Sequence, residues 1–313
     1  MPYAYLHNHS TDASQHAASL YDWNQRYEQL SGGRFSGSFE FLQLEGIHVF
    51  KETANRTLVQ SGHVRTDMVA IGSVRRVGAG GRYCGTELRQ GSVFGAAFDA
   101  EFHFLAGADM ELAAVSVPVV DLENLREALG DVDAPTQFKH HDVLLLSDGA
   151  ANAFQGLLNH ALDVAATGRV VDQPQARRML GISLTEAVLQ CGNLAETRRN
   201  KLSAVNKRRI VAKARAYMQQ QPDAVLAVPD ICKAIGASRR ALQYAFEEVL
   251  QVSPVTYLRL MRLNRVRADL QQAGASSVGD AAARWGFWHF SRFAAEYKAL
   301  FDELPSTTLQ RAR

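Results

Sequence analysis

Apolar residues in the first part of the chain follow a pattern that is typical of strands. In SFEFLQLEGIHVF, residues 38–50, large apolar side chains partly alternate with polar ones, as in a strand with one buried face. Further short apolar segments continue to residue 118, and Gly-, Asp- and Arg-rich turns separate them. Many short strands without a long helix between them predict an antiparallel β-barrel or sandwich over residues 37–118.

The spacing of apolar residues becomes helical after Asp142. Residues 147–166 and 173–191 place apolar side chains three and four positions apart, which predicts two helices that close the N-terminal domain. The polar, charged stretch 192–209 then indicates a join between domains. The expected fold class is α+β, with a strand-rich domain, a linker and an all-α domain at residues 1–195, 196–208 and 209–311.

The C-terminal residues keep helical spacing throughout, and start and stop signals divide them into several helices. Pro222 ends a helix predicted over 205–221, because proline cannot continue a helix interior. Ser238 has a hydroxyl suited to cap the start of the next helix. Ser253 and Pro254 open a long helix that runs to Gln272, and Ser277 opens another.

Two stretches of this region have the same outline. GASRRALQYAF at residues 236–246 and GFWHFSRFAAEY at residues 286–297 both begin with Gly and space their large apolar residues by four. Each follows a short predicted helix, so each unit is a helix-turn-helix, at 228–249 and 278–301. The offset is 50 residues before the turn and 51 after it, as the pairs Val228–Val278, Asp230–Asp280, Gly236–Gly286, Leu242–Phe293, Phe246–Tyr297 and Pro254–Pro305 show.

The charge is divided unevenly along the chain. Residues 1–195 carry 14 Lys and Arg against 22 Asp and Glu, a net charge of −8, whereas residues 196–313 carry 20 against 10, a net charge of +10. A basic helical domain beside an acidic one is the electrostatic pattern of a nucleic-acid-binding module. Together with the duplicated unit, it predicts binding of double-stranded DNA. A basic face that is merely solvated is the alternative.

The C-terminal third resembles the AraC/XylS transcription regulators. Their pattern, GxSxRxLxxxF, a linking helix with a Ser-Pro start, and GFxxxxxFxRxFK, is matched over both units. The resemblance implies a DNA-binding regulator, expected to be an activator that acts on promoter DNA with RNA polymerase as a further partner, and a cupin-like N-terminal domain by outline. The matching residues are Gly236, Ser238, Arg240, Leu242, Phe246, Ser253, Pro254, Tyr257, Gly286, Phe287, Phe293, Tyr297 and Lys298.

The two units depart from each other in the residues that would meet DNA. Arg and Gln read base edges in the major groove by paired hydrogen bonds, so the first unit is expected to read bases. The second unit has Ala295 where the family usually has Arg, so it is expected to contact mainly phosphates. The expected base-reading residues are Arg239, Arg240, Gln243 and Tyr244, and those of the second unit are His289, Ser291, Arg292 and Lys298. The linking helix is expected to set the two units in successive major grooves, with Arg259, Arg262, Arg265 and Arg267 near the DNA backbone.

The N-terminal domain is expected to bind a small-molecule effector of unknown identity. The predicted inner-face residues of its pocket are Phe41, Val49, Phe102 and Phe104. The alternative is a barrel filled by side chains that serves dimerisation. A homodimer through residues 142–191 is also expected, unless both helices use their apolar faces on the barrel.

Other chemistry is poorly supported by the sequence. His7 and His9 lack a third ligand and a suitable Glu, the His140–His141 pair is expected in a surface turn, and the Gly-rich residues 78–82 in a hairpin turn. Cys84, Cys191 and Cys232 are too few and too far apart for a zinc site, and they fit reduced thiols in a cytoplasm. No catalytic residue, cofactor, metal or membrane segment is therefore expected. A non-specific nucleic-acid-binding protein with an enzymatic or storage barrel remains the alternative function.

Overall fold

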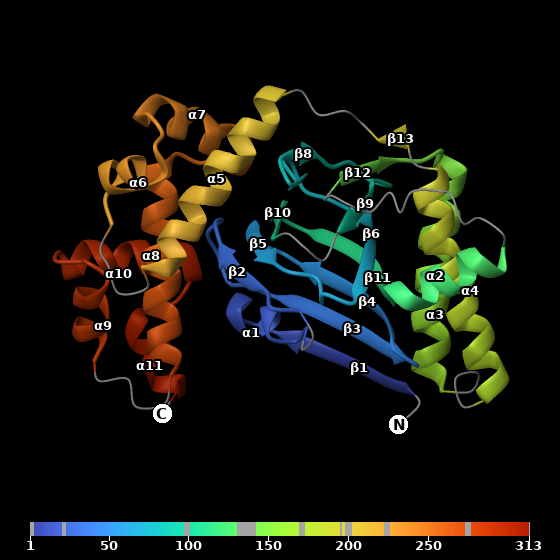
Figure 1. Ribbon diagram of the computed structural model, residues 1–313. Coiled ribbons are helices and arrows are strands. Elements are labelled where there is room, and N and C mark those ends of the chain that lie inside the picture. The colour runs from blue at the N-terminus through green and yellow to red at the C-terminus, as the bar shows by residue number, and fades with distance from the viewer. Residues whose placement is uncertain are drawn as a thin grey trace.

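The structure of the protein is a computed structural model that describes residues 3–20, 23–96, 101–129, 142–168, 173–194, 196–197, 202–221, 226–272 and 277–312. The strands occupy the middle of the molecule, with helices of the N-terminal part on one side and the C-terminal helices on the other (Figure 1). The His140–His141 pair and residues 198–201 of the predicted linker lie outside the described residues.

The larger of two sheets has eight described strands, which pair antiparallel. They are β1 (Tyr3–Ser10), β3 (Gly37–Leu44), β4 (Ile47–Ala54), β6 (Met68–Arg76), β9 (Val93–Ala96), β11 (Met110–Pro118), β12 (Asp142–Leu145) and β13 (Glu196–Thr197). Their order across the sheet is β1-β3-β4-β11-β6-β9-β12-β13. Strands β3 and β4 form a tight hairpin, because Glu45 and Gly46 both adopt the positive φ that a two-residue turn requires.

The smaller sheet has five described strands and faces the larger one. They are β2 (Arg26–Gln29), β5 (Leu58–Gly62), β7 (Arg82–Tyr83), β8 (Thr86–Glu87) and β10 (Phe102–Ala106), in the order β2-β5-β10-β7-β8. An aromatic core lies between the two sheets and includes Phe39, Phe50, Phe102 and Phe104. The predicted antiparallel β-architecture is thus confirmed.

Helices cover the outer face of the larger sheet. These helices are α2 (Val119–Ala128), α3 (Asp148–Thr167) and α4 (Pro174–Leu194), whereas the short helix α1 (Ala13–Ala17) precedes β2 and packs into the core between the two sheets. Helices α3 and α4 confirm the two helices predicted from apolar spacing. Leu158 of α3 and Leu184 of α4 are fully buried in one cluster with Val115 of the sheet.

The C-terminal part consists of helices, as predicted. They are α5 (Leu202–Gln220), α6 (Val228–Ile235), α7 (Arg239–Leu250), α8 (Pro254–Gln271), α9 (Val278–Arg284), α10 (Phe290–Phe301) and α11 (Pro305–Ala312). The first helix-turn-helix unit is α6–α7, the second is α9–α10, and α8 links them. The hydroxyl groups of Ser238, Ser253 and Ser277 cap α7, α8 and α9, as the sequence predicted.

Each unit has its own apolar cluster, but the first unit shares its cluster with the smaller sheet. Val59 of β5 and Leu105 of β10 are buried together with Leu242 and Phe246 of α7. The second unit packs Phe293 and other residues of α10 against α8 without such a contribution. The outer face of the smaller sheet therefore belongs to the core of the first unit.

Elements before residue 37 were not predicted. The N-terminal residues form β1 at the edge of the larger sheet, and His7 and His9 are exposed on it. Its sequence, YAYLHNHS, does not alternate apolar and polar side chains regularly and so gives no strand signal. Strand β2 is four residues long, and α1 is five, which is too short for periodicity to detect.

Candidate nucleic-acid interface

The duplication seen in the sequence extends to the backbone of both units. Helices α7 and α10 are each 12 residues long. Gly236 and Gly286 adopt positive φ in the turn before each of them, and Gln251 and Asp302 adopt φ 57° directly after each. These four residues keep the offsets of 50 and 51, so the two units repeat the same chain path.

Helix α7 exposes the predicted base-reading residues along one side. Arg239, Arg240 and Tyr244 are exposed, whereas Leu242 and Phe246 are fully buried on the opposite side. Arg240 Nη2 donates to the Tyr244 hydroxyl at 3.3 Å, and its guanidinium lies 5.4 Å from the centre of the Tyr244 ring. Gln243 is half-buried and donates to Glu247. The structure thus brings all four residues together on one helix.

Helix α10 presents a different surface. His289, Ser291, Arg292 and Lys298 are all exposed, as expected for residues that meet DNA. Arg292 Nε, however, donates to Glu296 at 2.9 Å. Arg292 is therefore held along its own helix.

Trp285 and Trp288 of the second unit differ in burial. Trp285 is buried and donates to Asp269 at 2.8 Å, while Trp288 is 75% exposed. A cleft of about 540 Å³ between the two units is lined in part by Trp288, His289 and Arg259.

Each of the four arginines of α8 that are expected near the DNA backbone makes a contact within the chain. Arg259 pairs with Glu296 of α10. Arg262 donates to the Leu226 carbonyl, and Arg265 donates to that of Met218 at 2.9 Å. Arg267 is 13% exposed and faces the N-terminal part. In the described structure the charge of α8 holds the two units and the barrel together.

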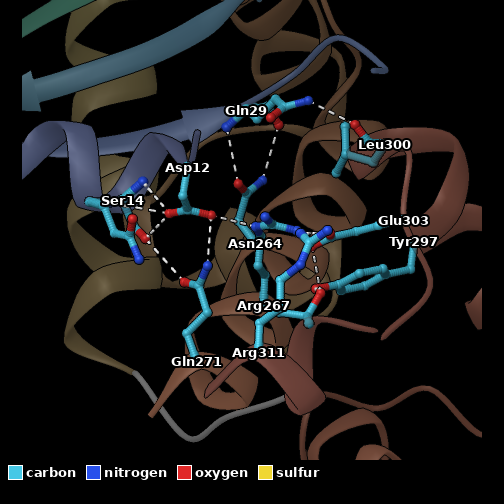
Figure 2. A network of polar contacts seen from close by, with 12 residues as sticks. Asp12, Ser14, Gln29, Asn264, Arg267, Gln271, Tyr297, Leu300, Glu303 and Arg311 are labelled. Carbon is cyan, nitrogen blue, oxygen red and sulfur yellow. Dashed lines mark hydrogen bonds and ion pairs between the residues drawn. The ribbon is translucent and has the colours of Figure 1, made fainter. Parts of the chain in front are cut away.

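A polar network joins the N-terminal part to α8 and to the turn after α10 (Figure 2). Asp12, at the start of α1, accepts from Arg267 Nε at 2.5 Å and from Gln271 Nε2 at 2.8 Å. Arg267 also donates to Glu303 at 2.7 Å. Burial raises the pKa of Asp12, but the charge of Arg267 and the hydrogen bonds from Ser14, Arg267 and Gln271 outweigh it and lower the pKa overall.

Strand β2 contributes a second part of this network. The backbone of Gln29 exchanges two hydrogen bonds of 3.0 Å with the side chain of Asn264, and its Nε2 donates to the Leu300 carbonyl at 2.7 Å (Figure 2). At Gly32 a Cβ would lie 2.5 Å from the Ala299 carbonyl oxygen, so the loop approaches α10 closely only because it has glycine there.

A second buried polar cluster lies between the smaller sheet and the first unit. Arg215 of α5 is 1% exposed and donates to the Tyr257 hydroxyl at 2.8 Å, to Ser61 at 3.0 Å and to His103 Nδ1 at 2.7 Å. Tyr257 in turn donates to Glu28 of β2. Burial lowers the pKa of Arg215, but Tyr257 and Glu28 outweigh it, so the pKa is raised and the charge is retained. Buried polar contacts to the barrel are thus made by α5 and α8, which flank the first unit, and by Leu300 of the second unit.

The four predicted effector-pocket residues do not share one cavity. Phe102 and Phe104 line a cavity of about 30 Å³ between the sheets, and the half-buried Phe41 packs at the edge of the same core. Val49 lies on the other face of the larger sheet, among the residues beneath α3. It pairs with Leu42, whereas Phe41 pairs with Phe50, and neighbouring residues of a strand point to opposite faces.

Aromatic rings fill most of the space between the sheets. The ring centres of Tyr83 and Phe94 are 4.4 Å apart, and those of Trp23 and Phe50 are 5.4 Å apart. A cavity of about 30 Å³ has room for about one or two water molecules. The cavity is also lined by the buried carboxylate of Glu52. Its Oε1 accepts from Gln60 Nε2 at 3.1 Å and lies 3.2 Å from Nε2 of His16 in α1.

Residues considered for other chemistry occupy ordinary positions. Cys191 is buried, which raises the pKa of its thiol to about 12 and disfavours the reactive thiolate. Within the described ranges, no three His, Cys, Asp or Glu residues are grouped as a metal site would require. No helix in the described part of the chain is both long and apolar enough to cross a bilayer.

Comparison with known proteins relates this chain to transcription regulators. A family model described as a helix-turn-helix domain matches residues 231–311. A probable thc operon regulatory protein of Rhodococcus erythropolis is 37% identical over 103 residues, which are 32% of this chain and 31% of that protein. The XylDLEGF operon transcriptional activator 1 of Pseudomonas putida is 40% identical over 78 residues, 24% of each chain. The chain thus spans about a third or less of the length of these relatives.

Among solved structures, the AraC-like transcriptional activator CuxR aligns with 90% of this chain and 100% of its own. The identity is 15% and the TM-score is 0.43, values too low to support an inference about function.

Proposed function

We propose that this chain, whose residues 231–311 form a helix-turn-helix domain of the AraC/XylS type, is a transcription regulator that binds promoter DNA with that domain. The observation that supports this most directly is the first recognition helix, α7. It exposes Arg239, Arg240 and Tyr244 in a domain whose residues carry a net positive charge. Arginine is the commonest reader of guanine in the major groove. In this proposal the protein acts as an activator in the cytoplasm and not as an enzyme.

The proposed division of labour follows the difference between the two units. Arg239, Arg240, Gln243 and Tyr244 read base edges in one major groove. His289, Ser291, Arg292 and Lys298 meet the next groove, where the charged ones contact phosphates and position the protein. Helix α8 has 18 residues and spans about 27 Å at ~1.5 Å per residue, and with its flanking turns it suits grooves ~34 Å apart.

Regulation by the N-terminal part is the second half of the proposal. The predicted bounds, 1–195 for the regulatory domain, 196–208 for the linker and 209–311 for the DNA-binding domain, shift in this proposal. Strand β13 (Glu196–Thr197) is part of the larger sheet and joins the regulatory domain, and the DNA-binding domain begins with α5 at Leu202. The buried contacts between barrel and helices support this, because an effector that changes the barrel would change how both units are held. Helix α1 offers a short route: His16 lies beside Glu52 in the barrel interior, and Asp12 pairs with Arg267 of α8.

The effector is proposed to displace aromatic rings around Phe102 and Phe104, since the cavity they line is small. A full-length chain titrated with candidate metabolites tests this by thermal shift. Stabilisation that is lost in Glu52→Gln supports an effector in the barrel. If no metabolite stabilises the chain and it activates transcription without any, the barrel serves as a structural domain.

A homodimer is also proposed. Most apolar residues of α3 and α4 face the sheet, but Met179 and Ile182 of α4 are 62% and 43% exposed and lie three apart, on one side of the helix. Sedimentation of the full chain and of Met179→Glu measures this association. A wild-type chain that is monomeric at micromolar concentration rejects the dimer.

Sequence preference decides between this function and non-specific nucleic-acid binding. The full-length chain should select a defined duplex from a random pool and prefer it over random DNA at physiological salt by at least ~10³-fold. Equal affinity for both would instead favour an enzymatic or storage barrel attached to a non-specific basic domain.

A further inference from the structure

The two recognition helices carry different kinds of side chain at equivalent positions, long and polar in α7 but short in α10. At the offset of 51, Arg240, Gln243 and Tyr244 of α7 correspond to Ser291, Ala294 and Ala295 of α10. The last two have no group that donates or accepts a hydrogen bond, and Ser291 has a short hydroxyl. Helix α10 therefore carries short side chains at the positions where α7 carries long polar ones.

Large apolar side chains stand at the start of α10 instead. Phe290, the first residue of the helix, is 52% exposed and occupies the position of Arg239. Trp288, two residues earlier, is 75% exposed and occupies that of Ala237. Neither is needed for the core of the unit, which is built from Phe293, Tyr297 and Phe301. Exposed aromatic rings that the core does not use indicate a binding surface.

The charges beside these rings favour nucleic acid as the partner. Arg292 is 69% exposed and Lys298 is exposed on the same helix. The carboxylate of Glu296 is compensated from two sides, by Arg259 and by Arg292. Cations beside exposed aromatic rings suit binding in the major groove, because the phosphates of both strands line its edges.

We propose that the second unit recognises thymine through its C5-methyl group, with Phe290 as the principal contact and Ala295 and Trp288 beside it. The thymine methyl is the apolar group on base edges in the major groove, and alanine and phenylalanine are side chains that contact it. The short side chains of Ser291 and Ala294 let α10 approach the base edges closely enough for this contact. The inference rests on the proposed function, and it makes the second unit a reader of sequence as well as a phosphate-binding element.

Replacement of thymine by deoxyuridine tests this, because it removes the methyl group and leaves base pairing unchanged. The full-length chain first selects its duplex from a random pool, and footprinting with Arg240→Ala and Phe290→Ala assigns each half-site to a unit. Deoxyuridine then replaces thymines of the second half-site one at a time. We expect about fourfold weaker binding for a contacted methyl, equivalent to ~0.8 kcal/mol for one buried CH₂.

Phe290→Ala should weaken binding to the thymine duplex and bind thymine and deoxyuridine duplexes equally. Arg292→Ala is the matched control on the same helix, and it should weaken both while preserving the difference between them. Thermal unfolding near the wild-type temperature shows that each variant is folded. If deoxyuridine leaves binding unchanged at every thymine of the second half-site, the inference is wrong. If the first unit still prefers its sequence in that case, the proposed function remains. A chain that selects no duplex rejects the proposed function itself.

Discussion

Asp12 and Arg267 are 255 positions apart in the sequence and form an ion pair of 2.5 Å, with side chains only 5% and 13% exposed. One belongs to the cap of a five-residue helix of the barrel, and the other to the helix that links the two DNA-binding units. The pair therefore fixes the position of α8 relative to the barrel. Arg267 also binds Glu303 in the turn after α10. One side chain of α8 therefore contacts both the barrel and the second unit.

Replacement of Arg267 by Gln should destabilise the protein. It would leave the carboxylates of Asp12 and Glu303 without their shared cation, and loss of one partner from a buried pair costs about 3 kcal/mol of unfolding free energy. Chemical denaturation measures the change. Arg65→Gln is the control, since Arg65 pairs with Asp67 in an exposed position and should cost less than about 1 kcal/mol. Equal costs for the two variants would contradict the role of Arg267.

The stability of the protein should depend on pH through Asp12. Burial raises the pKa of Asp12, but Arg267 and three hydrogen bonds outweigh it, so the folded pKa lies below the ordinary value of 3.8. A carboxyl group with a depressed pKa stabilises the fold above its unfolded pKa and loses this contribution as pH falls through the folded one. Unfolding free energy should therefore fall below about pH 4, and Asp12→Asn should reduce that dependence. An unchanged pH dependence in the variant would show that Asp12 does not carry it.

Arg240→Ala and Gln243→Ala should each weaken binding to the selected duplex far more than to random DNA. Loss of a bidentate base contact costs about 1–3 kcal/mol of binding free energy. Affinity titrations against both duplexes measure the ratio. Both side chains lie outside the buried face of α7, so the fold should be unaffected. Equal losses on the two duplexes would assign these residues to the phosphate backbone.

Lys298→Ala should weaken binding to the selected duplex and to random DNA by similar factors. The dependence of log affinity on log salt concentration should become shallower by about one unit, because one fewer phosphate is neutralised. Arg292→Ala should behave in the same way, with Glu296 still paired to Arg259. Selective loss of the preferred duplex in either variant would argue for a base contact instead.

The sequence predicted the elements with strong local signals. Ser238, Ser253 and Ser277 act as helix caps, because capping depends on a hydroxyl within a few residues of the backbone amides. The repeated units were visible because Gly236 and Gly286 both lie in a turn that requires positive φ. These features are set by neighbours in the chain, so one sequence is enough to predict them.

Features that depend on distant residues were missed. Val49 was assigned to the inner face, but the two-residue turn at Glu45 and Gly46 sets the register that pairs it with Leu42, and a register cannot be read from alternation alone. The contacts of Arg267 with Asp12 and Glu303 leave no local signal. From the sequence Arg267 was therefore expected near the DNA backbone, and its burial against Asp12 was not foreseen.

The sharing of Val59 and Leu105 with the core of the first unit has a practical consequence for dissection of the protein. A chain shortened to residues 202–313 would expose part of this apolar cluster to water, because Val59 of β5 and Leu105 of β10 would be gone. Such a fragment should be poorly soluble and prone to aggregate. Polar replacements on the side of α5 that faces β5 and β10 should restore its solubility without altering the exposed side of α7.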